Sequence, residues 1–285
     1  MKLSVFTVAT PDLTPQALIR AAKEAGLQGI EWRYTSTAPE RKGEAPSFWG
    51  NNLCTIDPRT VTDAELDALA EAVRAQGMTT AALTPYLTVN DVEATETAMR
   101  RAQRLGAKAI RVGVPRYDRT ADYRQLFAKA VAYLEQVEAF SKKYGVKGLV
   151  ETHHQTITAS ASLAHRLVER FSPEHIGVLY DPGNLVHEGY ENYRMGLELL
   201  GPYLAHVHVK NAGWFPGEKA GDAWSCRWVA LDRGIVDWKQ VLADLKAIGY
   251  DGWFGVEDFS GTHDSKTMLA TYAAWFRSLA EEVYA

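Results

Sequence analysis

Four segments of the chain contain side chains that can hold a metal ion, and in each the side chain ends or follows a short apolar run. The segments are GLVETHH with Glu151, GVLYDPGN with Asp181, AHVHVKN with His208 and GVEDF with Glu257. Three carboxylates and one imidazole suit a hard or borderline divalent ion. Four protein ligands leave coordination positions for substrate oxygens, so the ion can polarise a carbonyl group. The pattern therefore predicts metal-assisted catalysis.

The spacing of the histidines assigns the fourth ligand. His206 and His208 are two positions apart, so their side chains share one face of a strand, one pleat apart. We assign His208 as the ligand because it lies nearer the carboxyl end, and we expect His206 deeper in the core. His153 has the parity of Glu151 and is expected to border the cavity. Surface positions are expected for His165, His175, His187 and His263.

Short β-branched or aromatic runs alternate with helical patterns, and the alternation occurs eight times. Eight strand–helix units predict an α/β fold, a (β/α)8 TIM barrel formed by a single domain over residues 1–285. A doubly wound open sheet is the alternative, but no glycine-rich phosphate loop follows the first strand. The expected strands are 3–8, 29–33, 80–83, 109–112, 147–151, 176–181, 204–209 and 253–257.

The barrel explains how distant residues meet. Carboxyl ends of neighbouring strands lie side by side around one rim, so the four metal-competent side chains converge on one point. Two long connections, 34–61 and 210–234, also follow strands and are expected at this catalytic face. The second connection contains Trp214, Phe215, Trp224 and Trp228. These aromatic side chains either contact substrate or have a packing role, inside the loop or in a dimer interface.

Helix boundaries carry local signals. Thr14 before Pro15, the Thr62–Glu65 capping box and Asn90 are expected to begin helices. Glycines that tolerate positive φ are expected after five helices, at Gly26, Gly77, Gly106, Gly145 and Gly249.

Composition restricts the partners. A formal charge of -4 argues against nucleic acid, which requires a basic face. No segment approaches the ~20 apolar residues of a membrane span, and the N-terminal run is interpreted as a strand rather than a signal peptide. Cys54 and Cys226 fit no metal-binding spacing. We expect a reduced cytoplasmic protein with a small-molecule substrate; assembly into a homo-oligomer is left open.

The motifs resemble those of a known family. ETH, DPGN, HVHVKN and VEDF, with GIEWR and GIVDWKQVLADLKAIGYDGWFGVE, resemble the xylose-isomerase-like superfamily of sugar phosphate isomerases and epimerases over essentially the whole chain. The resemblance implies a TIM barrel whose ligands match Glu151, Asp181, His208 and Glu257. In the ketose 3-epimerases of this family the two metal-bound glutamates exchange protons with opposite faces of the substrate; here these would be Glu151 and Glu257.

A second resemblance concerns the loops. ETH, HVHVKN, PYL and AIRVG are similar to segments of the 3-dehydroshikimate dehydratases. This similarity implies that four residues line the pocket as substrate-binding or acid–base groups. They are Tyr86, Arg111, His153 and Lys210.

One position departs from the motifs of both families, and another adds a similarity to the epimerases. Both families carry a histidine three residues after the metal aspartate, where this chain has Asn184. An asparagine can hydrogen-bond a substrate hydroxyl but cannot shuttle protons. Arg227, in WSCRW, falls where the epimerases place an arginine on the substrate, and we include it among the substrate-binding residues.

The chemistry common to these patterns is removal of a proton beside a carbonyl group, which gives an enediolate. Glu151 or His153 would accept the proton, and Lys210 or Arg111 would stabilise oxygen charge. We predict an isomerase or epimerase of a small sugar or keto-polyol, using Mn²⁺, with Mg²⁺, Co²⁺ or Zn²⁺ as alternatives. The second interpretation is a dehydratase or eliminase of the 3-dehydroshikimate or 3-keto-glycoside type. A non-catalytic sugar-binding barrel and an endonuclease IV-like repair enzyme rank below both.

Overall fold

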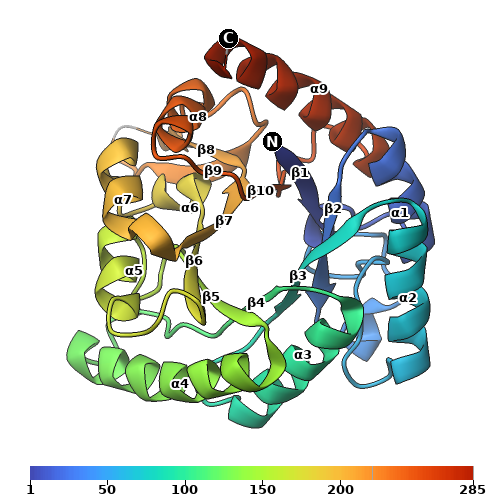
Figure 1. The fold of residues 1–285 in the computed structure, drawn as a ribbon. Coiled ribbons are helices and arrows are strands. Elements are labelled where there is room, and N and C mark those ends of the chain that lie inside the picture. The colour runs from blue at the N-terminus through green and yellow to red at the C-terminus, as the bar shows by residue number, and fades with distance from the viewer. Residues whose placement is uncertain (220, 285) are drawn as a thin grey trace.

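The computed structural model describes residues 1–219 and 221–284 of the chain. Parallel strands form a closed barrel in the order β1-β10-β7-β6-β5-β4-β3-β2, which confirms the predicted fold (Figure 1). Pairing of β1 with β10 joins the two ends of the chain and closes the sheet. The barrel strands are β1 (Lys2–Phe6), β2 (Gly29–Tyr34), β3 (Thr79–Pro85), β4 (Ala109–Arg111), β5 (Lys147–Glu151), β6 (Ile176–Tyr180), β7 (Leu204–Val209) and β10 (Trp253–Val256).

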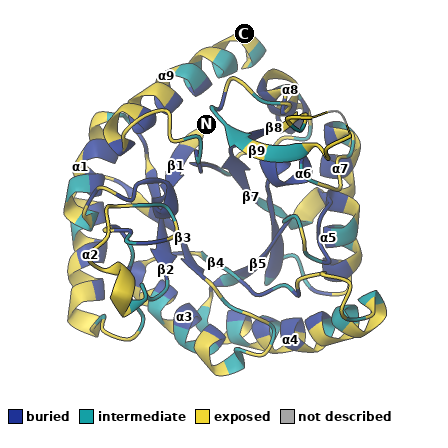
Figure 2. Ribbon diagram, turned by 180° about the vertical axis from the view of Figure 1, so that it is seen from behind, coloured by how far each residue is buried: buried dark blue, intermediate teal, exposed yellow. Residues whose placement is uncertain are grey.

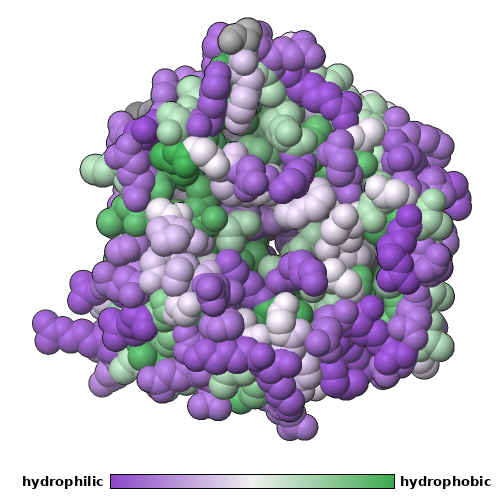
Figure 3. All heavy atoms as spheres, viewed as in Figure 1, coloured by the Kyte–Doolittle hydropathy of each residue, from purple (hydrophilic) through white to green (hydrophobic). Residues whose placement is uncertain are grey.

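Helices surround the barrel and bury one face each against it (Figure 2). In α2, for example, Leu66, Leu69 and Val73 are buried at helical spacing. Polar side chains cover most of the face seen in Figure 3, interrupted by small apolar patches. Among the described residues, no helix is long and apolar enough to span a bilayer. The helices are α1 (Pro15–Glu24), α2 (Asp63–Ala75), α3 (Val92–Leu105), α4 (Tyr123–Tyr144), α5 (Ala161–Val168), α6 (Pro182–Leu185), α7 (Tyr193–Leu200), α8 (Trp238–Ala247) and α9 (Ser265–Tyr284).

The strands present alternate side chains to the two sides of the barrel wall. Every residue of β2 is buried, as expected for a parallel sheet covered by helices. Glu31 points into the barrel, where it contacts His208, and Ile30 and Trp32 belong to the hydrophobic core. Strand parity therefore decides which residues reach the interior of the barrel.

Most of the predicted helix boundaries are confirmed. Thr14 caps α1, and the Thr62–Glu65 capping box begins α2. The prediction that Asn90 begins a helix is wrong: Asp91 is the N-cap of α3, and its carboxylate instead accepts a hydrogen bond from the Thr88 backbone N–H at 2.7 Å. All five predicted helix-ending glycines have positive φ.

The long connection after β7 contains a hairpin rather than only irregular loop. Strands β8 (Asn211–Phe215) and β9 (Ser225–Val229) pair antiparallel, from Asn211 opposite Val229 to Phe215 opposite Ser225. The buried Asn211 anchors its base: its Nδ2 donates to Leu231 O at 2.8 Å. The hairpin is therefore fixed to the barrel at the end of β7, beside the predicted metal ligands.

Candidate metal centre and adjoining cavity

The four predicted metal ligands converge at one end of the barrel. His208 Nδ1 lies 3.6 Å from Glu151 Oε1, Asp181 Oδ2 and Glu257 Oε2. The four ligand atoms lie within 4.8 Å of one another, and all four residues are buried. Among the described residues, His208 Nδ1 has no hydrogen-bond partner. A buried nitrogen facing three carboxylate oxygens fits a divalent cation.

Backbone contacts between neighbouring strands set this geometry. The Glu257 N–H donates to Val209 O at 3.0 Å, which places Glu257 beside the end of β7. The Asp181 N–H donates to the Thr152 hydroxyl at 2.8 Å. Asp181 Oδ1 accepts from the Asn184 N–H at 3.0 Å and so caps α6. The second oxygen of Asp181 is thereby directed at the centre.

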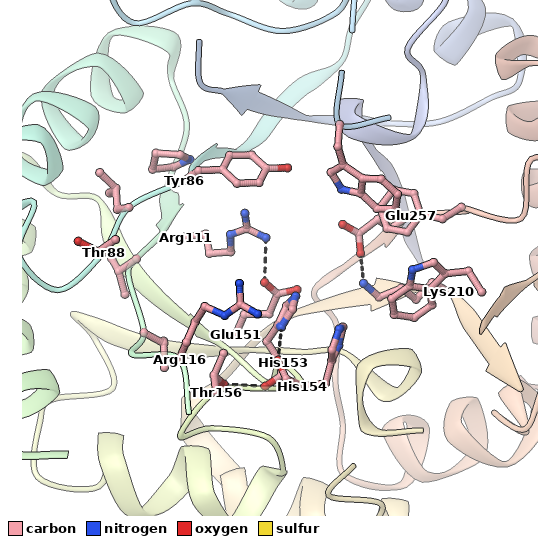
Figure 4. Close-up of a pocket in the computed structure, with 17 residues that line it drawn as sticks. Tyr86, Thr88, Arg111, Arg116, Glu151, His153, His154, Thr156, Lys210 and Glu257 are labelled. Atoms are coloured by element: carbon pink, nitrogen blue, oxygen red, sulfur yellow. Dashed lines mark hydrogen bonds and ion pairs between the residues drawn. The ribbon is translucent and has the colours of Figure 1, made fainter. Parts of the chain in front are cut away.

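Two basic side chains contact the acidic ligands. Arg111 Nη1 lies 2.8 Å from Glu151 Oε2, and Lys210 Nζ contacts Glu257 (Figure 4). Lys210 Nζ also lies 2.9 Å from Asp181 Oδ2. Burial alone would raise the pKa of Glu151, but the positive charge of Arg111 outweighs it and holds that pKa well below its usual range. Likewise, burial would lower the pKa of Lys210, but Asp181 and Glu257 hold it above its usual value. Glu151 is therefore ionised and Lys210 protonated at neutral pH.

A cavity of about 530 Å³ opens beside the four ligands. Glu151 and Glu257 line it, as do all four residues suggested by the loop resemblance: Tyr86, Arg111, His153 and Lys210. Sequence reasoning did not identify Trp49, Phe259 and Arg116 in its lining. Lys210 Nζ lies over the rings of Trp228, at 4.8 Å, and Phe259, at 5.4 Å, so the ammonium group sits between the carboxylates and an aromatic wall.

Both histidines after Glu151 line the cavity, whereas we singled out His153 alone. The ring of His154 stacks between those of His153 and His187, with centroids 4.3 Å and 4.2 Å away. His187, predicted at the surface, is half-buried: it follows α6 and its ring packs under that of Trp228 of the hairpin, with centroids 4.5 Å apart. His263 is exposed as predicted, while His165 and His175 are only partly exposed. Burial, with the charge of nearby His153, lowers the pKa of His154 to about 3.

Asn184, which we predicted among the substrate-binding residues, does not line the cavity. The residue is fully buried, and its Nδ2 donates to Glu151 Oε1 at 3.2 Å and Thr152 O at 3.1 Å. Its Oδ1 must therefore accept from His154 Nδ1, 3.1 Å away. That bond leaves Nε2 of a neutral His154 without a proton, so Nε2 can accept one. The amide therefore contacts both a predicted metal ligand and a cavity-lining imidazole.

Arg227, the other residue predicted to bind substrate, does not line the cavity either. It lies on β9, is exposed, and covers the ring of Phe215 with its guanidinium carbon 5.5 Å from the centroid. Neighbouring Trp228 lines the cavity. Because successive side chains of a strand point to opposite faces, only one of these two residues can face the cavity.

Glu31 was not identified from the sequence, although it lies next to a predicted ligand. Its Oε2 is 3.0 Å from Nε2 of His208, on the side of that ring away from the carboxylates. Burial alone would raise the pKa of Glu31, but contacts with His208 and His206 outweigh it and keep the pKa well below its usual range. A glutamate inside the buried run GIEWR was the signal that could have revealed it.

Comparison with known proteins agrees with this architecture. The sequence pattern described as xylose isomerase-like TIM barrel matches residues 19–279. An inosose dehydratase from Geobacillus thermodenitrificans is 23% identical over 231 residues, covering 72% of this chain and 76% of that protein. A structure of the IolI protein with a bound zinc atom superposes with a TM-score of 0.74 at 18% identity, covering 99% of this chain and 98% of the other. D-psicose 3-epimerase from Clostridium cellulolyticum H10, solved with D-tagatose, gives 0.68 at 15% identity, covering 100% and 98%.

Proposed function

This chain belongs to the xylose isomerase-like TIM barrel family, and from that premise we propose that it is a divalent-metal-dependent isomerase or epimerase of a small sugar or keto-polyol. One observation carries the proposal: two glutamates of the metal centre, Glu151 and Glu257, both line the cavity. They come from the ends of β5 and β10, which are separated in the barrel by β6 and β7. Two carboxylates can therefore approach a substrate from different sides (Figure 4).

The proposed reaction moves a proton on carbon. A bound divalent ion supplies Lewis-acid polarisation of the substrate carbonyl. One of Glu151 and Glu257, as the carboxylate, removes the proton beside that carbonyl. Either the other, as the carboxylic acid, donates a proton to the opposite face, or the first returns its proton to the neighbouring carbon. Arg111 and Lys210 donate hydrogen bonds to the oxygen on which negative charge develops. Aromatic residues Trp228 and Phe259 limit the access of water to the reacting atoms.

Three carboxylates and one imidazole favour a hard or borderline ion, and we propose Mn²⁺. The structurally similar IolI protein was solved with a bound zinc atom, which is consistent with a divalent ion in this chain. The centre therefore combines one ion, two candidate bases and two cationic donors around one cavity.

A dehydratase or eliminase is the second candidate, and a specific observation favours it. Arg111 and Lys210 engage both glutamates, which leaves the His153 imidazole as a cavity-lining base that contacts no cation among the described residues. The Lys210 ammonium can protonate a leaving hydroxyl. The 23% identity to an inosose dehydratase is consistent with this reaction. Single-base chemistry with loss of water would then replace proton return to carbon.

Deuterium exchange distinguishes these reactions. The protein is incubated in D2O with ketoses, inososes, 3-keto-sugars and 3-dehydroshikimate, and each mixture is followed by NMR. Deuterium incorporation with interconversion of two sugars supports the isomerase or epimerase, whereas loss of water with a new conjugated absorbance supports the dehydratase. A chelator should abolish the reaction and added Mn²⁺ should restore it. Turnover that is equally fast with and without metal would contradict both candidates.

A further inference from the structure

We propose that Glu31 is a positioning residue for the metal centre: it holds the proton of His208 on Nε2 and thereby presents Nδ1 to the cation. This inference rests on the proposed metal centre and adds a residue that lies outside the four ligands. It concerns how one ligand is oriented, and the reaction itself can be an isomerisation or an elimination.

The two nitrogens of His208 face different partners. Nδ1 faces the oxygens of Glu151, Asp181 and Glu257 at 3.6 Å, whereas Nε2 lies 3.0 Å from Glu31 Oε2. Both His208 and Glu31 are completely buried. Bulk solvent therefore does not reach Nε2, and Glu31 Oε2 is the acceptor within hydrogen-bond distance of it.

This arrangement selects one tautomer when a cation is bound. A neutral imidazole carries one proton, and a metal requires a nitrogen lone pair. With the ion on the Nδ1 side, the remaining proton lies on Nε2 and is donated to Glu31. Such a hydrogen bond also makes the imidazole a stronger ligand, because the carboxylate stabilises the positive charge that the ring acquires.

The surrounding residues restrain the same ring. Phe6 stacks on His208, with ring centroids 5.6 Å apart and planes at 17°. Thr84 donates to Glu31 Oε1 at 2.5 Å, which leaves Oε2 for the histidines. His206 Nε2 lies 3.1 Å from that oxygen. His208 is thus held on its face by Phe6 and on its edge by Glu31.

A glycine provides the space for this cluster. A Cβ atom added at Gly255 would lie 3.0 Å from His206 Nε2, 3.3 Å from Ser4 Oγ and 3.5 Å from Glu31 Oε2. The first two distances are too close for ordinary packing. The absence of a side chain on β10 at this level therefore lets the carboxylate and two imidazoles share the barrel interior.

The experiment compares metal binding in wild-type protein, Glu31→Gln and Ser4→Ala by competition titration with Zn²⁺. The glutamine keeps the shape of residue 31 but removes its charge, so the affinity should fall by about 10- to 100-fold. Ser4→Ala is the matched control: Ser4 Oγ is a buried hydroxyl of the same cluster that has no hydrogen-bond partner among the described residues, so its removal should leave the affinity unchanged. Thermal unfolding of the metal-free proteins checks that each variant is folded.

A second measurement needs no variant. In zinc-loaded wild-type protein, long-range ¹H–¹⁵N NMR of the histidine rings should show His208 with Nε2 protonated and Nδ1 without a proton. Zinc on Nε2, a second zinc ion held by Glu31 and His206, or wild-type affinity in folded Glu31→Gln would each overturn the inference. Failure of wild-type protein to bind any divalent ion would instead overturn the proposed function on which the inference rests.

Discussion

The Lys210 ammonium lies 2.9 Å from Asp181 Oδ2, the same carboxylate oxygen that faces His208 Nδ1 at 3.6 Å. A cation entering the four-residue centre must therefore share this oxygen with Lys210 or displace the ammonium toward the cavity. Lys210 lines the cavity under Trp228, so displacement would bring it closer to a bound substrate. The lysine is thus both a competitor of the metal and a candidate acid or oxygen-binding group.

Replacing Lys210 with methionine should separate these two properties. Metal affinity should be retained or increased because a competing positive charge is removed. Turnover of a substrate found in the deuterium screen should fall by about 10²- to 10⁴-fold, the usual contribution of a positioned proton donor. Calorimetric metal titration and steady-state kinetics measure the two effects. Loss of metal binding together with activity would show that Lys210 holds the carboxylates in place.

Removing a predicted metal ligand should lower the metal affinity, in contrast to the replacement of Lys210. We expect Glu257→Gln and His208→Ala to reduce the metal content of protein purified without chelator, because each removes one of four ligands. Glu135→Gln, at an exposed position on α4, is the control and should keep the wild-type content. Elemental analysis gives the ratio of metal to protein. Unchanged content in both ligand variants would refute the assignment of the centre.

Asn184→Ala should lower stability because it leaves buried acceptors without a donor. Both Glu151 Oε1 and Thr152 O accept hydrogen bonds from its amide. The loss should be about 1–3 kcal/mol in the free energy of unfolding, measured with urea. Asn90→Ala is a matched control at an exposed site and should change stability by less than about 0.5 kcal/mol. Equal effects of the two substitutions would contradict the positioning role of Asn184.

Acid should destabilise the protein partly through His154. Its pKa is about 3 in the folded protein against an ordinary value of 6.5, with burial as the main cause. Above pH 6.5 the group is neutral in both states; as the pH falls toward 3, the unfolded chain binds the proton more readily and stability is lost. His154→Gln should therefore show a shallower loss of unfolding free energy over this range than the wild type. An identical pH slope in the variant would show that His154 does not contribute.

Ligand binding should alter the fluorescence of the hairpin. Trp228 lines the cavity, whereas Trp224 is 61% exposed. We predict that a saturating polyol changes the tryptophan emission, that Trp228→Phe removes most of this change, and that Trp224→Phe preserves it. Protease sensitivity of residues 210–234 should fall in parallel if the hairpin closes over the ligand. Constant emission and constant cleavage would identify the hairpin as a static packing element.

The sequence alone predicted the barrel and the convergence of Glu151, Asp181, His208 and Glu257. Both follow from local information: strand and helix patterns set the order of elements, and residues at the carboxyl ends of neighbouring parallel strands meet at one rim. The glycines at helix ends and the Thr62–Glu65 capping box are likewise local, since each depends on the conformation of a few consecutive residues. The prediction of Asn90 as the N-cap of α3 was wrong because two adjacent residues, Asn90 and Asp91, could both cap the helix.

Only the tertiary structure decided what surrounds those ligands. Glu31 and His208 are 177 positions apart, and their contact depends on β2 and β7 both pointing these residues into the barrel. The burial of Asn184, the packing of His187 against Trp228 and the exposure of Arg227 depend on how α6 and the hairpin pack. Composition and spacing identify residues able to do chemistry, whereas contacts between distant segments determine which of them face the metal centre, the cavity or the solvent.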